Sequence, residues 1–147
     1  SGQELPQPGR VYINYAHSLH EQKKNDQALQ NYLTAVKYLK DEKGERMMAG
    51  IAYKEIGDLY LHSDNLSGGL DMYNKALTTT AKDGELKYWS QFLVGKTYMK
   101  MNRNEQAQSI FAQMKAAAGA EGFWSNVVDF YVADAQWWNT YGDLVNP

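Results

Sequence analysis

Residues 53–77 read YKEIGDLYLHSDNLSGGLDMYNKAL, and this stretch decides the fold. Its two small residues Gly57 and Gly69 lie twelve positions apart on either side of a polar turn, and Tyr73 follows four positions later. Small residues let the backbones of two helices approach closely, and an aromatic side chain fills the space beside them. The stretch therefore predicts two antiparallel helices joined by a short turn.

The same arrangement recurs without gaps in YINYAHSLHEQKKNDQALQNYLTAV, from Tyr12, and in QFLVGKTYMKMNRNEQAQSIFAQMK, from Gln91. No proline interrupts residues 9–146, so long helices are allowed throughout. A single hairpin cannot bury both of its faces, and the repeated hairpins must therefore stack on one another. The equivalent small and aromatic residues are Ala16, Ala28 and Tyr32 in the first copy, and Gly95, Ala107 and Phe111 in the third.

This pattern resembles the tetratricopeptide repeat, whose consensus contains W-x2-L-G-x2-Y…A-x3-F. The resemblance implies an all-α fold in one domain, residues 10–147, built as a right-handed α-α superhelix of three helical hairpins. The expected repeats are about 10–43, 46–83 and 86–118, followed by a C-terminal capping helix at about 121–141. The matching residues of the second copy are Tyr53, Ile56, Gly57, Tyr60, Gly69, Tyr73 and Ala76.

The copies depart from the family pattern in their spacing, because they begin 41 and then 38 residues apart instead of 34. No copy has the consensus proline near its end. The excess residues lie in the links between copies, which predicts longer helices there, as in extended repeats of this family. Gly44 and Gly84 in these links suit left-handed helix caps. N-cap residues are expected to start each second helix after its turn.

The two ends of the chain read differently. Residues 1–9 are polar and rich in helix breakers, which predicts a flexible leader. The C-terminal helix repeats the first-helix pattern without a second helix after it, so it is either a cap or half of a fourth repeat. Adjacent Trp137 and Trp138 point about 100° apart on such a helix. The favoured interpretation is that they wrap over the third hairpin; the alternative is a second surface, which would serve a homo-oligomer or a missing segment.

Composition excludes several classes of function. The chain carries 15 basic and 17 acidic residues, a net charge of −2. Domains that bind nucleic acid usually have an excess of positive charge, so this balance argues against nucleic-acid binding. No apolar run is long enough for membrane insertion. There is no cysteine, so thiolate metal sites and disulfides are excluded. These features fit a cytoplasmic or a periplasmic protein equally.

No catalytic motif or nucleotide-binding loop is present, so neither an enzyme nor a cofactor is expected. The three histidines, His17, His20 and His62, all map to first helices. They could bind a transition metal, or make ligand capture dependent on pH. The favoured interpretation is that they are polar side chains able to hydrogen-bond a peptide, with no metal bound.

In the resembled family the first helices line a concave groove that holds a partner protein or peptide. The leading hypothesis is therefore a non-catalytic interaction scaffold, and the alternative is a ligand- or peptide-sensing regulatory domain of a larger protein. Some members of this family hold the C-terminus of a peptide with a carboxylate clamp of Lys, Asn, Asn, Lys and Arg. None of these residue types is present at the matching positions of this chain, which are Ile13, His17, Glu55, Trp89 and Leu93. The groove residues that the resemblance implies are Ile13, His17, His20, Glu21, Lys54, Asp58, Leu61, His62, Trp89, Phe92, Lys96, Met99 and Lys100.

Overall fold

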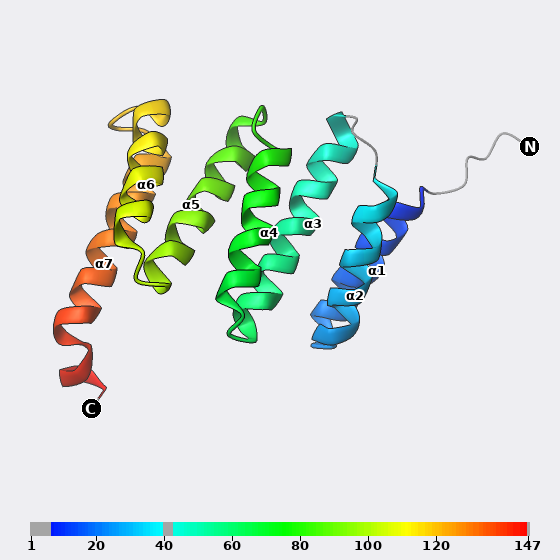
Figure 1. The fold of residues 1–147 in the computed structure, drawn as a ribbon, viewed down its shortest axis with the longest axis horizontal. Helices are drawn as coiled ribbons and strands as arrows, with labels where there is room; N and C mark the ends of the chain where they lie inside the picture. Colours follow the sequence, from blue (N-terminus) through cyan, green and yellow to red (C-terminus); the bar gives the residue numbers. More distant parts are fainter. Residues whose placement is uncertain (1–6, 40–42, 147) are drawn as a thin grey trace, which may run out of the picture.

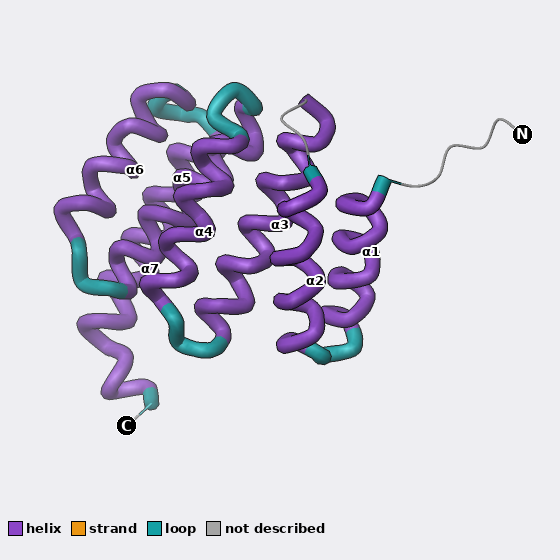
Figure 2. Tube along the Cα trace, turned by 45° about the vertical axis from the view of Figure 1, so that its right-hand side comes forward, coloured by secondary structure: helices purple, strands orange, loops and turns teal. Residues whose placement is uncertain are grey.

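The structure, a computed structural model, describes residues 7–39 and 43–146. Within these residues all regular secondary structure is helical, which confirms the all-α prediction. The short connections between the helices leave little chain outside them (Figure 2). The helices are α1 (Pro8–Glu21), α2 (Asn25–Tyr38), α3 (Lys43–His62), α4 (Leu66–Thr79), α5 (Gly84–Lys100), α6 (Asn104–Ala118) and α7 (Phe123–Val145).

The helices stack in chain order. Each one packs mainly on its neighbours in sequence, with α1 against α2, α3 against α4 and α5 against α6. The pairs lie side by side in one row, with α1 and α7 at opposite ends (Figure 1). Such nearest-neighbour packing is the architecture of a helical-repeat solenoid. The tetratricopeptide-like fold is thus confirmed, while the right-handed superhelix stays a prediction.

Small residues bring the helices of a pair together, as the sequence predicted. A Cβ added at Gly57 would lie 2.5 Å from a ring carbon of Tyr73, and one at Gly95 would lie 2.4 Å from a ring carbon of Phe111. Real Cβ atoms do not approach that closely, so a larger residue at either position would force the aromatic ring to shift. Tyr73 and Phe111 are only 1% and 4% exposed, and they form the centre of their hairpins.

The turns within the three hairpins share one backbone conformation. Lys23, Asp64 and Asn102 have φ values of 61°, 61° and 60°, in the left-handed region that asparagine and aspartate tolerate better than most residues. Their positions differ by 41 and 38 residues, the same offsets that relate the sequence copies. The sequence repeat is therefore also a repeat of backbone geometry.

Side-chain capping after these turns occurs only once among the described hairpins. Asn65 accepts a hydrogen bond from the backbone N–H of Gly68, at 2.9 Å, and so caps α4. The N-cap residues of α2 and α6 are Lys24 and Arg103, which make no side-chain capping bond. The expected caps in the first and third hairpins are therefore wrong, because each helix begins one residue too early for its polar side chain to serve.

The links between hairpins lengthen the first helices, as predicted. Helices α3 and α5 have 20 and 17 residues, against 14 in α1. The prediction of left-handed caps at Gly44 and Gly84 is wrong, because Gly44 lies inside α3 and Gly84 opens α5. In the described part of the chain, Gly119 is the glycine with a positive φ, 88°, at the end of α6.

The ends of the chain also differ from expectation. Helix α1 begins at Pro8, inside the expected leader 1–9, because proline is well suited to the first turn of a helix. Residues 1–6 lie outside the described residues. Helix α7 runs to Val145 and carries Trp137 and Trp138 in its second half. Trp137 and Trp138 are 46% and 45% exposed, so the wrapping interpretation is wrong.

Candidate ligand groove

A largely apolar hollow lies where α3, α5 and α7 face one another. It has a volume of about 460 Å³, and we call it the aromatic cavity. It brings together side chains from three helices that are far apart in the sequence, which stacking of the hairpins makes possible. Its walls are Lys54, Asp58, Glu85, Trp89, Phe92, Leu93, Lys96, Phe123, Trp124 and Val127.

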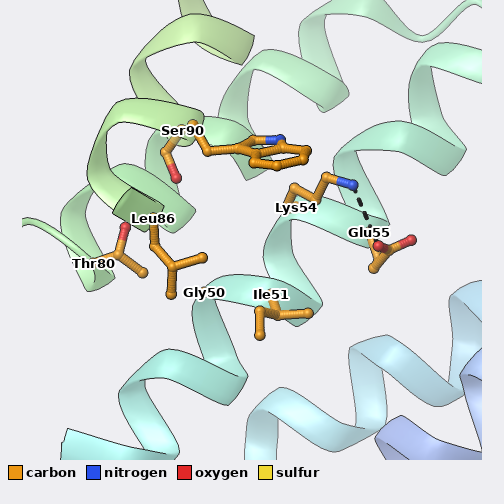
Figure 3. A pocket seen from close by; sticks show the side chains of 8 residues that line it. Gly50, Ile51, Lys54, Glu55, Thr80, Leu86 and Ser90 are labelled. Carbon is orange, nitrogen blue, oxygen red and sulfur yellow. Dashed lines mark hydrogen bonds and ion pairs between the residues drawn. The ribbon is translucent and has the colours of Figure 1, made fainter. Parts of the chain in front are cut away.

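A smaller hollow of about 190 Å³ adjoins it along α3 and α5 and shares Lys54 and Trp89 with it. Figure 3 shows Ile51 and Leu86 at one side of this hollow and the ammonium of Lys54 turned toward Glu55. Trp89 lines both hollows and is 48% exposed. An exposed indole shared by two apolar hollows is a natural contact point for a ligand.

The aromatic rings of the cavity support one another. Phe92 contacts the ring of Tyr131 edge-on at 5.4 Å and that of Trp124 at 6.3 Å, while Trp89 meets Trp124 at 6.0 Å. The indole N–H of Trp124 donates a hydrogen bond to Glu85 at 3.1 Å, which fixes its orientation. The rings thus form a preformed apolar wall.

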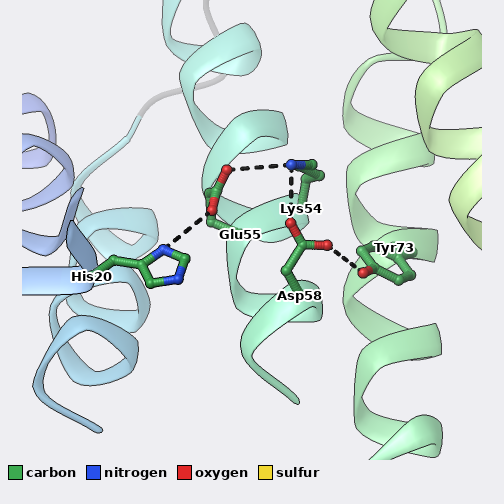
Figure 4. A network of polar contacts seen from close by, with 5 residues as sticks. All are labelled: His20, Lys54, Glu55, Asp58 and Tyr73. Atoms are coloured by element: carbon green, nitrogen blue, oxygen red, sulfur yellow. Dashed lines mark hydrogen bonds and ion pairs between the residues drawn. The ribbon is translucent and has the colours of Figure 1, made fainter. Parts of the chain in front are cut away.

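The charged residues of α3 belong to a network that satisfies them internally (Figure 4). The ammonium of Lys54 lies 2.9 Å from Asp58 and 3.4 Å from Glu55, and Glu55 lies 3.7 Å from His20 on α1. The hydroxyl of Tyr73 on α4 donates a short hydrogen bond to Asp58. Burial by itself would lower the pKa of Lys54, but Asp58 and then Glu55 raise it above its ordinary value.

Lys96 differs from Lys54 in having no such partner. Its ammonium lies 5.6 Å from the centre of the Tyr131 ring. No carboxylate in the described residues forms an ion pair with it. Burial lowers the pKa of Lys96, the charge of Lys100 lowers it further, and Asp58 opposes this only in part. The cavity therefore contains a partly desolvated cation without a matching anion.

The groove residues expected from the sequence divide into three sets. Lys54, Asp58, Trp89, Phe92 and Lys96 line the aromatic cavity. A separate hollow of about 570 Å³ lies between the ends of α1 and α3. Its lining residues include His20, Glu21, Asp58 and His62.

The third set lies outside these hollows. Leu61 is half-buried and packs against the cluster around Tyr73. Met99 lines a hollow of about 190 Å³ that faces α6 and α7. A role of either residue in ligand binding stays a prediction. Ile13 packs on the core of α1–α3, while His17 and Lys100 are exposed and line none of the described hollows.

The sequence missed the contribution of α7 to the cavity. Phe123, Trp124 and Val127 close its far wall, and Glu85 holds Trp124 in place. The helical spacing of Trp124, Val127 and Tyr131 predicts an apolar face on this helix. It does not predict which other helix that face packs against.

The histidines do not converge on a metal position. Among the residues that the structure describes, no three His, Asp or Glu side chains are placed to hold one ion. His20 is close to Glu55, while His62 lies at the end of α3, across the hollow that both line. None of the described helices is long and apolar enough to cross a membrane.

Comparison with protein families supports the architecture. Residues 9–38, which span α1 and α2, match the family model described as Tetratricopeptide repeat. This match covers the first hairpin, and the consecutive packing of the remaining described helices is consistent with a tetratricopeptide-like solenoid. Such repeats suggest a protein–protein interaction scaffold and are generally non-catalytic. The comparison with curated proteins gives no match.

Proposed function

We propose that this protein is a non-catalytic interaction scaffold and that its aromatic cavity holds a segment of a partner protein. The segment presents a bulky apolar side chain with a carboxylate beside it. The apolar side chain enters between Trp89, Phe92 and Phe123, and the carboxylate pairs with Lys96. This arrangement extends the general role of tetratricopeptide repeats to a defined chemistry.

The observation that carries the proposal is the unpaired ammonium of Lys96. A charge in a partly apolar site is costly unless it is paired, and the two nearby carboxylates are already engaged. Asp58 is held by Lys54 and Tyr73, and Glu85 accepts from the indole of Trp124. A ligand carboxylate is therefore the group that the cavity lacks.

The apolar walls supply the second half of the argument. A volume of about 460 Å³ lies within the range of ligand pockets, roughly 300–1,000 Å³. Phe123 and Trp89 are 70% and 48% exposed, so they lose a large apolar area from water when a side chain covers them. Tryptophan and other aromatic anchors dominate the binding energy of protein interfaces.

The proposal is tested with fluorescent peptides of matched composition, measured by anisotropy. One set carries Phe or Leu beside Asp or Glu, a second replaces the acid by Asn or Gln, and a third replaces it by Lys. We expect the acidic set to bind most tightly, the neutral set roughly tenfold more weakly, and the basic set not at all, because a charge-assisted hydrogen bond contributes roughly 1.5–3 kcal/mol. Equal binding of all three sets would remove Lys96 from the proposal.

Matched variants locate the binding position. Lys96→Gln should weaken the acidic peptides about tenfold, while Lys100→Gln, which makes the same charge change one turn further along α5, should leave them unchanged. Trp89→Ala should abolish binding, and Trp138→Ala, a change at an equally exposed tryptophan outside the cavity, should not. Loss of binding in both lysine variants would indicate a diffuse charge effect and contradict a defined cavity.

A further inference from the structure

Helix α7 lies at the end of the row of helices (Figure 1). It carries a stripe of exposed, mostly aromatic side chains. Phe123, Phe130, Trp137 and Leu144 recur every seven residues, which is close to two helical turns, so they share one face. These side chains are 70%, 74%, 46% and 79% exposed, whereas Val128 on the opposite side is 2% exposed. A continuous apolar stripe of this kind marks a protein interaction surface.

Small or polar residues alternate with the large ones on the same face. Asn126, Ala133 and Thr140 are also spaced by seven and are exposed. Helices pack well when a large side chain faces a small one, so that the layers interdigitate. The stripe therefore needs a partner with the same alternation in the opposite order.

A second copy of α7, running antiparallel, has this property. With a two-fold axis near residue 135, Phe130, Trp137 and Leu144 of one helix each face a small or polar residue of the other, whereas Phe123, at the start of the helix, has no such counterpart within α7. A parallel pair would instead place Trp137 on Trp137 and leave the small positions facing one another. The antiparallel layers are Trp137 with Ala133, Phe130 with Thr140, and Leu144 with Asn126 of the second copy.

We propose that α7 is a dimerisation helix that pairs antiparallel with α7 of a second copy of this chain. A self-complementary patch is the requirement for an interface with two-fold symmetry. The three exposed aromatic rings of the stripe offer on the order of 450 Å² per protomer, since each such side chain can bury roughly 150–250 Å². With Leu144 and the interleaved residues, the pair approaches the roughly 1,200 Å² at which stable interfaces begin.

The charges of α7 predict how the stability of this dimer depends on salt concentration. The helix contains Asp129, Asp134 and Asp143 and no lysine or arginine. Asp129 is paired with Lys115 at 2.6 Å, but Asp134 lies near the proposed axis and meets its own counterpart there. Salt screens this repulsion and should therefore strengthen the dimer. A basic partner helix would instead be attracted by these carboxylates and weakened by salt.

Sedimentation velocity of the full chain over a concentration series tests the interface. We expect a monomer–dimer equilibrium that shifts toward dimer in 0.5 M compared with 0.05 M salt, concentrations that screen the carboxylates more and less strongly. Trp137→Glu should give a monomer throughout. Trp138→Glu is the matched control, because Trp138 is equally exposed but lies off the seam, and it should still dimerise.

Ala133→Trp is a second variant that keeps the test decisive if Trp137→Glu folds poorly. Position 133 is exposed in the single chain, so the substitution should leave the circular dichroism spectrum unchanged. It should nonetheless abolish the dimer, because two large side chains then meet. A wild-type chain that stays monomeric at all concentrations, or equal effects of the two tryptophan variants, would overturn the proposal.

The orientation is tested with cysteines, since the chain has none of its own. Asn126→Cys and Leu144→Cys proteins are mixed and oxidised. Antiparallel pairing predicts a disulfide between the two different variants and little cross-linking of either alone. Cross-linking of each variant with itself would indicate a parallel pair and overturn the antiparallel arrangement.

Discussion

The middle hairpin, α3–α4, and the helix α7 both carry aromatic residues at helical spacing. In the hairpin Tyr73 is buried, whereas in α7 many of these side chains are exposed. In the hairpin, Gly57 and Tyr73 leave no free space between the helices. In α7, Trp124 is buried, while Trp137, thirteen residues further on, is 46% exposed. A hairpin carries its own partner in the sequence, whereas α7 packs on α5 and α6 along one face and leaves its other face exposed in this structure. The difference teaches that aromatic spacing alone does not distinguish a core from a surface.

The largest effect is expected at the tight contact of the middle hairpin. Gly57→Leu forces a side chain onto the ring of Tyr73, which already lies 2.5 Å from a Cβ at this position. Overpacking typically costs roughly 1–3 kcal/mol and occasionally more. Because a Cβ alone already clashes at this position, the four carbon atoms of leucine should cost more than this range and more than any of the changes below. We expect a loss of cooperative unfolding, measured by circular dichroism during thermal denaturation. A folded variant of unchanged stability would show that the hairpin tolerates separation of its helices.

The two tryptophans of α7 should respond very differently to the same change. Trp124→Ala removes a side chain that is 8% exposed and that contacts Trp89 and Phe92, and it should cost roughly 3–5 kcal/mol. Trp137→Ala should change the stability of the monomer by less than about 0.5 kcal/mol. Urea denaturation at a concentration where the chain is monomeric measures both. Similar losses in the two variants would mean that Trp137 is part of the core.

The buried tyrosines of the hairpins predict a loss of stability at high pH. Burial, followed by the charge of Glu55, raises the pKa of Tyr32 to about 12; burial and the hydrogen bond to Asp58 raise that of Tyr73 further. The unfolded chain ionises its tyrosines near pH 10. The folded state binds more protons above that pH, so its stability is complete below about pH 10 and falls as the pH rises toward 12.

The measurement is urea denaturation between pH 9 and 12, the range in which tyrosines ionise. The slope should reach at most about 1.4 kcal/mol per pH unit for each buried tyrosine. Tyr32→Phe should flatten the slope, and Tyr15→Phe, at a position that is 54% exposed, should not. A slope that is the same in all three proteins would assign the alkaline loss to other groups.

The smallest effect is expected at a glycine that makes no close contact. A Cβ added at Gly44 would meet nothing within 4 Å, and the residue lies in the first turn of α3. Gly44→Ala should therefore stabilise the protein, by a few tenths to about 1 kcal/mol, because alanine favours the helix. Thermal denaturation detects the change. A destabilised variant would indicate that this position needs the freedom of glycine, as the sequence first suggested.

The sequence by itself determined the hairpins. The small residues at Gly57 and Gly95, the aromatic residues that follow, and the turns with their repeated offsets are local features within a few dozen residues of each other. Close packing between two helices depends mainly on side-chain size at fixed spacing, which sequence records directly. For this reason the fold and the longer first helices could be anticipated, whereas the binding role of the groove residues stays a prediction.

Only the tertiary structure decided which side chains line the groove, which are buried and which remain exposed on the surface. It packed the half-buried Leu61 against the cluster around Tyr73, placed Trp124 in the cavity wall and joined Asp58 to Tyr73. Within the described residues it left Lys96 without an ion-pair partner. These outcomes depend on how far each hairpin rotates against the next, which no spacing within one helix records. The exposure of Trp137 has the same cause, because burial at the end of a stack is set by the presence or absence of a neighbour.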